Sequence, residues 1–292
     1  MRLLTVPNWS FGRDKDLLRL FDDLLQGWGL TIHFLQSDVD HNRTVSAFSG
    51  EAEVVFERLE RLCEAAFERI DLNRHMGVHP RIGALDVCPF LRLDDEVYPL
   101  KLKIEAFAQR LSDRFDLPIY LYEKSEQGKH ANDLPTLRKG GFGGLLGQEL
   151  SPDFGPNHAH KFLGATVMGE RNFLIAMNVN FRSDNLDFVR RLARQMRVSR
   201  DEGDARFTGI RALGLPLVSR HMVQLSMNLT QPDLTPPDAV VEWALAAARK
   251  AGVQHAENEL IGVIRESDLP RATRLPVKRE QVVTFFHAKD AK

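Results

Sequence analysis

The 292-residue sequence contains only two cysteines, Cys63 and Cys88. Two cysteines in a chain of this length cannot form the disulfide framework of a small secreted domain. The first residues are apolar only briefly before charged residues follow, which is unlike a secretory signal peptide. We therefore expect both thiols to be reduced and buried, and the protein to be cytoplasmic.

The sequence also lacks a long hydrophobic run and an excess of charge of one sign. No apolar stretch reaches the roughly 18–20 residues that a membrane helix needs, so no membrane association is expected. The 39 basic and 40 acidic residues nearly cancel, and such a balance does not favour binding to a nucleic-acid backbone. Hydrophobic residues make up 43% of the chain, which is enough for a folded core.

The first half of the chain alternates between strand and helix patterns. Apolar residues recur at helical spacing over residues 14–25, 51–70 and 97–116, the last series starting at Val97. Short runs that are apolar or rich in β-branched residues predict strands between these helices. The expected strands cover residues 3–7, 30–35, 44–48, 84–90 and 117–122.

The second half repeats this rhythm after a long polar segment. Residues 123–154 are glycine-rich, and we expect an irregular segment with one helical turn. Strands are expected at 173–181, 223–230 and 259–264, and helices at 186–196 and 238–251. The order indicates an α+β protein built from two units of the split βαβ kind, with a boundary near residues 170–182.

Two histidines four residues apart, His75 and His79, are the first candidates for chemistry. On a helix this spacing would suit a zinc ion, but Gly77 and Pro80 interrupt any helix and no third ligand is evident. Two loop histidines that merely satisfy backbone groups are an equally simple alternative. Because histidine titrates near neutral pH, acid/base catalysis is the third interpretation, with Arg81 as a neighbouring cation.

Further polar clusters offer binding groups. Asp40 lies in a polar turn and offers a carboxylate to an amidine or a pterin ring, although a solvated hairpin turn is the simpler interpretation. Asp86 is a possible orienting partner for His79, or an ordinary residue at a strand end. The loop at 151–158 is constrained by two prolines and a glycine and is either a binding loop or a connector. The glycine run at 140–147 lacks the G-K-[ST] ending of a P-loop and is expected only to be flexible.

Four blocks of sequence together resemble the formiminotransferase domain of glutamate formimidoyltransferase. They read V-P-N-W-S-F-G at 6–12, D-H-N-R-T-V at 40–45, and R-H-M-G-V-H-P-R-I-G-A-L-D-V-C-P-F at 74–90. The fourth contains P-D-F-G-P at 152–156, followed by G-A-T-V at 164–167 and F-L-I-A at 173–176. The likeness runs from about residue 4 to about residue 267. Phe11 replaces the family's glutamate, and Gln36 stands where some relatives have an acidic residue.

This resemblance implies two ferredoxin-like subdomains, at residues 1–173 and 174–292, with the active site between them. It implies that His79 is the catalytic histidine and that a folate-binding stretch begins at the G-P of D-F-G-P. Asn8, Asp40 and Arg81 are candidate substrate contacts, and no metal is expected. The implied folate-binding residues are Gly155, Pro156, Asn157, His158, Ala159, His160, Lys161, Phe162, Leu163 and Gly164.

The implied reaction moves a formimino group from N-formimino-L-glutamate to N5 of tetrahydrofolate, within histidine degradation. Tetrahydrofolate would be a co-substrate, the protein a homodimer, and a separate cyclodeaminase a possible partner. Three alternatives remain open. The donor could be formiminoglycine or a formylated amino acid, the chain could be a non-catalytic folate-binding module, or His75 and His79 could serve a metal-dependent amidohydrolase.

Overall fold

The computed structural model describes residues 1–94 and 99–285, so the expected helical position Val97 lies outside the described residues. The chain divides into two compact units, Met1–Arg171 and Asn172–Thr284, each with its own sheet and helices. The α+β class expected from the sequence is confirmed. Within the described ranges, no helix combines the length and apolarity needed to cross a membrane.

A mixed sheet forms the centre of the first unit. Its order is β3-β4-β1/β2-β5-β7-β6, with antiparallel pairing except for the β5–β7 and β6–β7 pairs, which are parallel. The strands are β1 (Arg2–Thr5), β2 (Asn8–Trp9), β3 (Thr31–Asp38), β4 (Arg43–Glu51), β5 (Leu85–Arg92), β6 (Ile119–Leu121) and β7 (Thr166–Glu170).

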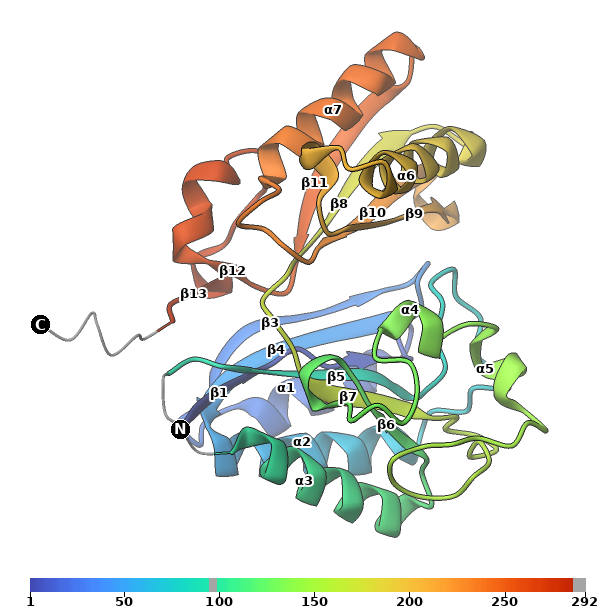
Figure 1. The fold of residues 1–292 in the computed structure, drawn as a ribbon, viewed down its shortest axis with the longest axis vertical. Helices are drawn as coiled ribbons and strands as arrows, with labels where there is room; N and C mark the ends of the chain where they lie inside the picture. Colours follow the sequence, from blue (N-terminus) through green and yellow to red (C-terminus); the bar gives the residue numbers. More distant parts are fainter. Residues whose placement is uncertain (95–98, 286–292) are drawn as a thin grey trace, which may run out of the picture. The chain divides into compact units, whose positions relative to one another are not determined.

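Three helices cover one face of this sheet, as Figure 1 shows: α1 (Lys15–Leu25), α2 (Ala52–Phe67) and α3 (Leu100–Phe115). The side chain of Asp14 caps α1 by accepting hydrogen bonds from the backbone N–H groups of Asp16 and Leu17. Asp116 ends α3 in a left-handed conformation. All three helices occur where the apolar periodicity predicted them, within a few residues at each end.

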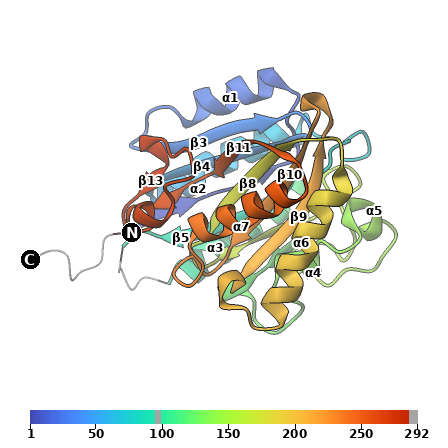
Figure 2. The same ribbon diagram turned by 90° about the horizontal axis from the view of Figure 1, so that it is seen from above.

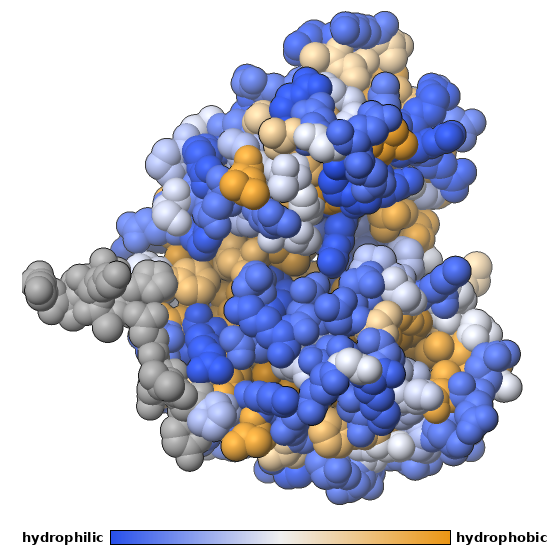
Figure 3. All heavy atoms as spheres, viewed as in Figure 1, coloured by the Kyte–Doolittle hydropathy of each residue, from blue (hydrophilic) through white to orange (hydrophobic). Residues whose placement is uncertain are grey.

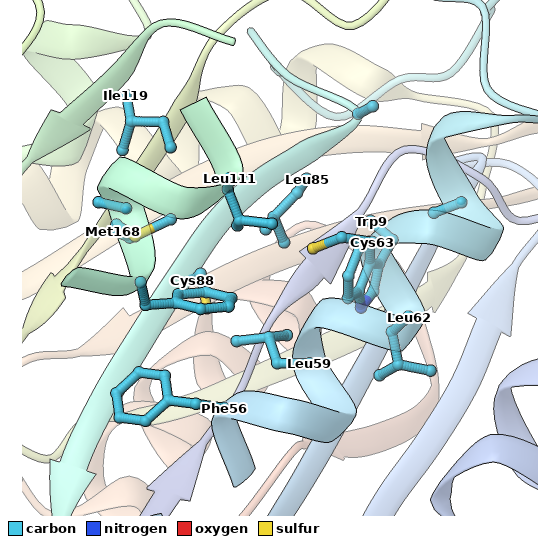
Figure 4. Packing of buried hydrophobic residues seen from close by; sticks show 14 of the residues in the cluster. Trp9, Phe56, Leu59, Leu62, Cys63, Leu85, Cys88, Leu111, Ile119 and Met168 are labelled. Atoms are coloured by element: carbon cyan, nitrogen blue, oxygen red, sulfur yellow. The ribbon is translucent and has the colours of Figure 1, made fainter. Parts of the chain in front are cut away.

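The main core of the first unit lies between these helices and the sheet. Figure 4 shows Trp9 from β2, Leu59 and Cys63 from α2, and Cys88 from β5 in this cluster. The indole nitrogen of Trp9 donates to Oγ of Ser46 at 3.0 Å, so the buried polar atom is satisfied. Both cysteines are buried and unbridged, as expected from the sequence.

The opposite face of the sheet carries a second, smaller apolar cluster. Val87 and Val167 contribute to it from β5 and β7. The long segment at 123–154 packs against this cluster through Leu134, Leu137 and Leu145. The expectation of one helical turn in this segment was wrong, because it contains the 3₁₀ turn Glu123–Ser125 and two short helices, α4 (Leu134–Leu137) and α5 (Gly141–Leu145). The few apolar side chains of α4 and α5 pack against the sheet, although the segment as a whole is polar in composition.

The second unit is a β-α-β-β-α-β arrangement with a fully antiparallel sheet in the order β11-β8-β10-β9. Figure 2 shows its two helices running over the same sheet. The elements are β8 (Ile175–Arg182), α6 (Leu186–Asp201), β9 (Ile210–Leu217), β10 (Met222–Leu229), α7 (Pro237–Lys250) and β11 (Gln254–Ile261). A short parallel pair, β12 (Ile264–Arg265) and β13 (Val282–Val283), follows.

Among the described residues, the sequence-based expectation missed the two-residue strands β2 and β13 and two longer strands, β7 and β9. In β9 the alternation is interrupted by Gly214 and Pro216, residues that disfavour strands in general. Among the described strands, β9 pairs only with β10 and so lies at the edge of its sheet, a position where proline is tolerated. The other strand, β7, is five residues long and buried on both faces, so it has little alternation to detect.

Surface composition agrees with the balanced charge of the chain. On the face drawn in Figure 3, hydrophilic residues predominate, and hydrophobic residues form small separate groups. A network of polar side chains also lies on the sheet of the second unit. Asn178 and Asn180 of β8 donate to Glu259 of β11 at 2.8 and 2.9 Å, and Gln224 of β10 donates to the same carboxylate at 3.2 Å.

Candidate active site

His79 lies in the loop between α2 and β5, within the first unit. This loop passes close to the turn between β3 and β4, where the N–H of Val78 donates to the carbonyl of Asp40 at 3.1 Å. Gly77 permits the close approach, because a Cβ atom there would lie 2.1 Å from the carbonyl oxygen of His41. Gly77, one of the two residues that exclude a helix in the sequence, thus allows the loop of His79 to lie against the β3–β4 turn.

The hydrogen bonds of His79 define its protonation state. Nη1 of Arg43 lies 2.8 Å from Nε2, and the carbonyl of Pro80 lies 2.9 Å from Nδ1. A guanidinium only donates and a carbonyl only accepts. Nε2 must therefore be an unprotonated acceptor, while Nδ1 carries the hydrogen. His79 is a neutral imidazole whose basic nitrogen faces Arg43.

Its surroundings keep this imidazole neutral. Burial lowers the pKa of His79 well below its usual range, and the positive charges of Arg43 and Arg138 and the neighbouring His41 lower it further. The rings of His41 and His79 are 5.7 Å apart between centroids. At neutral pH this histidine is therefore in the unprotonated form that a general base requires, and the lowered pKa makes it a weaker base than a free imidazole.

Arg43, the first residue of β4, is the nearest cation to the basic nitrogen. Its Nη2 donates to the side-chain oxygen of Asn8, the first residue of β2, while Nε is buried without an acceptor in the described part of the chain. Desolvation, followed by repulsion from Arg138, lowers the pKa of Arg43 to about 9. Asn8, a predicted substrate contact, therefore orients this guanidinium in the structure.

His75 and Arg81 form a neighbouring pair. Nε2 of His75 donates to the carbonyl of Asn42 at 2.7 Å, and Nδ1 accepts from Nη1 of Arg81, so His75 is the opposite tautomer to His79. Burial and the charge of Arg81 lower the pKa of His75 to about 4. Nη2 of Arg81 donates to the carbonyls of His41 and His79. Both ring nitrogens of His75 are thus used in holding the loop.

Asp86 does not contact His79 in this arrangement, contrary to the possibility raised from the sequence. Its carboxylate accepts from the backbone N–H of Ile82 at 2.8 Å and from the guanidinium of Arg138. This buried ion pair attaches the segment between α4 and α5 to β5. Asp86 therefore positions Arg138, and Arg138 in turn adds positive charge near His79 and Arg43.

A pocket of about 310 Å³ opens beside these groups. The N–H of Phe142 in α5 donates to the carbonyl of Arg81 at 2.9 Å, which brings the glycine-rich segment over the pocket. This segment was expected only to be flexible, but two of its residues form part of the wall. The pocket is lined by Leu72, His75, His79, Arg81, Phe142 and Gly143.

The stretch from Gly155 to Gly164, expected to bind folate, lies next to this loop. The carbonyl of Phe162 accepts from the N–H of Leu72, and the carbonyl of Leu163 accepts from that of Ala84, both at 2.9 Å. Gly164 has φ of +71°, and a Cβ atom there would lie 1.9 Å from the carbonyl oxygen of Ile82. His160 accepts from the backbone N–H groups of Phe162 and Leu163, which shapes the turn. The stretch is therefore built onto the loop that carries His79.

The sequence analysis gave no role to several residues of this site, among them Arg43, Arg138 and Phe142. Arg43 lies within the D-H-N-R-T-V block, so its presence in a family motif was the available signal. Arg138 and Phe142 lie in the polar segment, and nothing in their local pattern indicates contact with residues more than 50 positions away. Among the described residues, no group of three or more histidine, cysteine, aspartate or glutamate side chains is arranged to hold a metal ion.

The fold and the site define an α+β protein with a neutral histidine set among arginines beside a pocket. Two family models match the chain: the N-terminal subdomain of the formiminotransferase domain at residues 2–171 and the formiminotransferase domain at residues 176–291. The chain belongs to the formiminotransferase family. The family resemblance stated from the four sequence blocks is thereby confirmed.

Curated relatives match nearly the whole chain. A glutamate formimidoyltransferase of Thermoplasma acidophilum is 32% identical over 90% of this chain and 88% of its own length. One from Streptococcus pyogenes is 33% identical over 88% of this chain and 87% of its own length. A formimidoyltransferase-cyclodeaminase of Sus scrofa is 33% identical over 89% of this chain but only 49% of its own length. The chain thus matches the two glutamate formimidoyltransferases along most of their length and the formimidoyltransferase-cyclodeaminase along about half of its length.

Proposed function

We propose that this protein transfers the formimino group of N-formimino-L-glutamate to N5 of tetrahydrofolate, giving 5-formimidoyltetrahydrofolate and L-glutamate. Membership of the formiminotransferase family and the names of the relatives support this assignment. Tetrahydrofolate acts as a co-substrate in this proposal, and the reaction belongs to histidine degradation. A homodimer and a separate cyclodeaminase partner are part of the same proposal.

The observation that carries the proposal is the state of His79. The second histidine of R-H-x-G-x-H-P-R is neutral here, with its Nε2 lone pair directed at a hydrogen-bond donor and its Nδ1 hydrogen fixed by a carbonyl. A transfer between two amines needs one group that takes a proton from the attacking nitrogen and returns it to the departing nitrogen. A neutral, oriented imidazole suits both steps.

In the proposed reaction, N5 of tetrahydrofolate attacks the amidine carbon and forms the new C–N bond. Nε2 of His79 takes the proton that N5 loses. The tetrahedral intermediate then collapses, the bond from carbon to the glutamate nitrogen breaks, and the imidazolium returns its proton to that nitrogen. Holding two substrates in one site supplies much of the remaining acceleration.

Binding roles follow from the same geometry. We assign the stretch from Gly155 to Gly164 to folate, and its hydrogen bonds to the catalytic loop support that assignment. Asp40 and Arg81 are proposed contacts for the amidine and a substrate carboxylate, and Asn8 is proposed to act beside them. All three lie in segments that contact Arg43 or the loop of His79.

The subdomain boundary and fold type are proposals as well. We place the boundary after residue 173, and the division of contacts between Arg171 and Asn172 supports it. We class the second unit as ferredoxin-like because its β-α-β-β-α-β order and β11-β8-β10-β9 sheet agree with a split βαβ fold. The same order is proposed for the core of the first unit, with β6 and β7 added.

The direct test is to incubate the protein with formiminoglutamate, with and without tetrahydrofolate, and to measure free glutamate and the folate product by mass. Glutamate release that depends on tetrahydrofolate is the expected result. Release without folate would replace the transferase with a hydrolase. If glutamate is not released while folate still binds, formiminoglycine and formylated amino acids become the donors to test.

A further inference from the structure

Arg43 is a half-buried cation with a fully buried Nε, and its described partners are all neutral. Nη1 donates to the imidazole of His79 at 2.8 Å, Nη2 donates to the amide oxygen of Asn8, and Nε has no acceptor in the described part of the chain. Burying a charge without an opposite charge is costly in free energy. The low pKa of about 9 for this arginine reflects that cost. A guanidinium in this condition is well suited to receive an anion.

The charged residues near Arg43 also favour the binding of an anion there. Of the charged groups that shift the pKa of Arg43, Arg138 and Arg81 are cations and only Asp86 is acidic. The Asp86 carboxylate is already bound to Arg138 and to the N–H of Ile82. Arg81 is likewise occupied, since it donates to His75 and to two carbonyl groups. Nε of Arg43 and Nε of Arg138 are both buried without an acceptor among the described residues. Arg138, however, is paired with the Asp86 carboxylate, whereas the hydrogen bonds of Arg43 go only to neutral groups.

We propose that Arg43 binds a carboxylate group of the formimino donor, and that it releases Nε2 of His79 when it does so. The planar guanidinium matches a carboxylate with two parallel hydrogen bonds, which its present neutral partners cannot offer. This inference rests on the proposed transfer from formiminoglutamate, a donor that carries two carboxylates. It adds Arg43 as the contact for one of these two carboxylates, beside Arg81, which lines the pocket and remains the proposed contact for the other.

The proposal gives substrate binding a direct effect on the base. In the structure the Nε2 lone pair accepts a hydrogen bond from Nη1 of Arg43. When a carboxylate takes that hydrogen bond, the lone pair becomes available for the proton of N5. In this exchange the substrate carboxylate replaces Nε2 of His79 as the hydrogen-bond acceptor for Arg43. No proton or electron is transferred. The base then becomes available when the donor is in position.

Binding measurements test this inference without relying on turnover. The probe is N-formyl-L-glutamate, the oxygen isostere of the proposed donor, titrated calorimetrically into wild type and Arg43→Gln. We expect the variant to bind it about 10- to 150-fold more weakly, the range for loss of hydrogen bonds to a charged group. In protein with ¹⁵N-labelled histidine, the probe should also shift the Nε2 resonance of His79 in wild type but not in the variant.

A matched arginine variant distinguishes the loss of a specific contact with the probe from a general loss of structure. Arg197 in α6 is also half-buried and donates to the carbonyl of Ala212 at 2.6 Å. Arg197→Gln should bind the probe within about twofold of wild type. Arg43→Lys keeps the charge but not the planar pair of donors, and it should bind about tenfold more weakly than wild type. Equal affinities in Arg43→Gln, Arg43→Lys and wild type would overturn the inference.

Kinetics give a second, independent result. Arg43→Gln should raise KM for formiminoglutamate about 10- to 150-fold and change KM for tetrahydrofolate by less than about twofold. An equal rise in both constants would overturn the carboxylate contact. If wild type binds the probe through Arg43 yet transfers no formimino group, the proposed function fails while the carboxylate site stands. If transfer occurs and probe binding ignores Arg43, the function stands and this inference fails.

Discussion

Nε2 of His79 and Nη1 of Arg43 lie 2.8 Å apart, although the two residues are 36 positions apart in the chain. The contact joins the loop before β5 to the first residue of β4. Because arginine can only donate, this one distance fixes the tautomer of the histidine, its neutral state and the direction of its basic lone pair. The acid/base chemistry of the site follows from this pairing more than from either residue alone.

Replacing His79 with alanine should remove the proton carrier while leaving the folate stretch in place. We expect kcat to fall by about 10²–10⁴, with the Kd for tetrahydrofolate within about threefold of wild type. The control is His255→Ala, which removes a histidine of the second unit whose Nε2 lies 2.9 Å from Oδ1 of Asn258. If His79→Ala keeps kcat within about tenfold of wild type, another residue carries the proton.

The pH dependence of kcat/KM should reflect the lowered pKa of His79. Burial is the main cause, and Arg43, Arg138 and His41 add to it. The free enzyme needs this histidine neutral, so kcat/KM should not decline because of His79 between pH 7.5 and 6.5. The decline should begin only below its usual pKa of about 6.5. A kcat/KM profile from pH 5 to 8 measures this, and a half-maximal point above pH 6.5 would contradict it.

Stability should decrease in acid partly because of His75. Its pKa is about 4 in the folded protein, lowered by burial and by Arg81, against about 6.5 in an unfolded chain. Between these values the unfolded state binds a proton that the folded state does not. The free energy of unfolding therefore falls as the pH drops from 6.5 to 4.

Urea unfolding at pH 7, 6, 5 and 4.5 should detect this contribution. His75→Gln should show a shallower loss of stability across that range, because the variant has no such proton to bind. His255→Gln, the matched change in the second unit, should keep the slope of the wild type. Parallel curves for His75→Gln and wild type would mean that His75 titrates normally in the folded protein.

Arg138→Met should leave the Asp86 carboxylate buried beside β5 without its cation. Removing one partner of a buried ion pair costs about 3–5 kcal/mol, and both side chains here are largely buried. Chemical denaturation measures the loss. The exposed pair of Arg19 and Asp16 offers the control, since Arg19→Met should change stability by less than about 0.5 kcal/mol. Similar effects for the two variants would argue against a structural role for Arg138.

Gly77→Ala should displace the catalytic loop. The new Cβ atom would lie 2.1 Å from the carbonyl oxygen of His41 and 2.8 Å from Nη2 of Arg81, so the backbone must move. We expect kcat to fall about 10²-fold, the effect of a misplacement of about 1 Å. Gly144→Ala is the control, because its Cβ would meet only an oxygen 3.7 Å away. Equal activity in the two variants would mean that the loop adapts without cost.

Local patterns predicted most of the fold. Apolar residues at helical spacing form a pattern that is visible within a short stretch of sequence. The helices α1, α2, α6 and α7 could therefore be predicted without knowing their tertiary contacts. The strand β9 was not, because Gly214 and Pro216 disrupt its alternation and only its edge position makes them acceptable. The segment at 123–154 was likewise misjudged, since its few apolar residues find their partners on a distant sheet face.

The sequence by itself determined the family, the importance of the loop around His79 and the need for Gly77 and Pro80 where a helix cannot continue. Only the tertiary structure decided which groups meet that histidine. Arg43, which contacts His79, belongs to β4, and Arg138 contacts Asp86 although the two residues are 52 positions apart in the chain. The register of the sheet and the packing of α4 and α5 create these contacts. Hydrogen-bond partners and charge states depend on such distances in space, which neither spacing along the chain nor composition can specify.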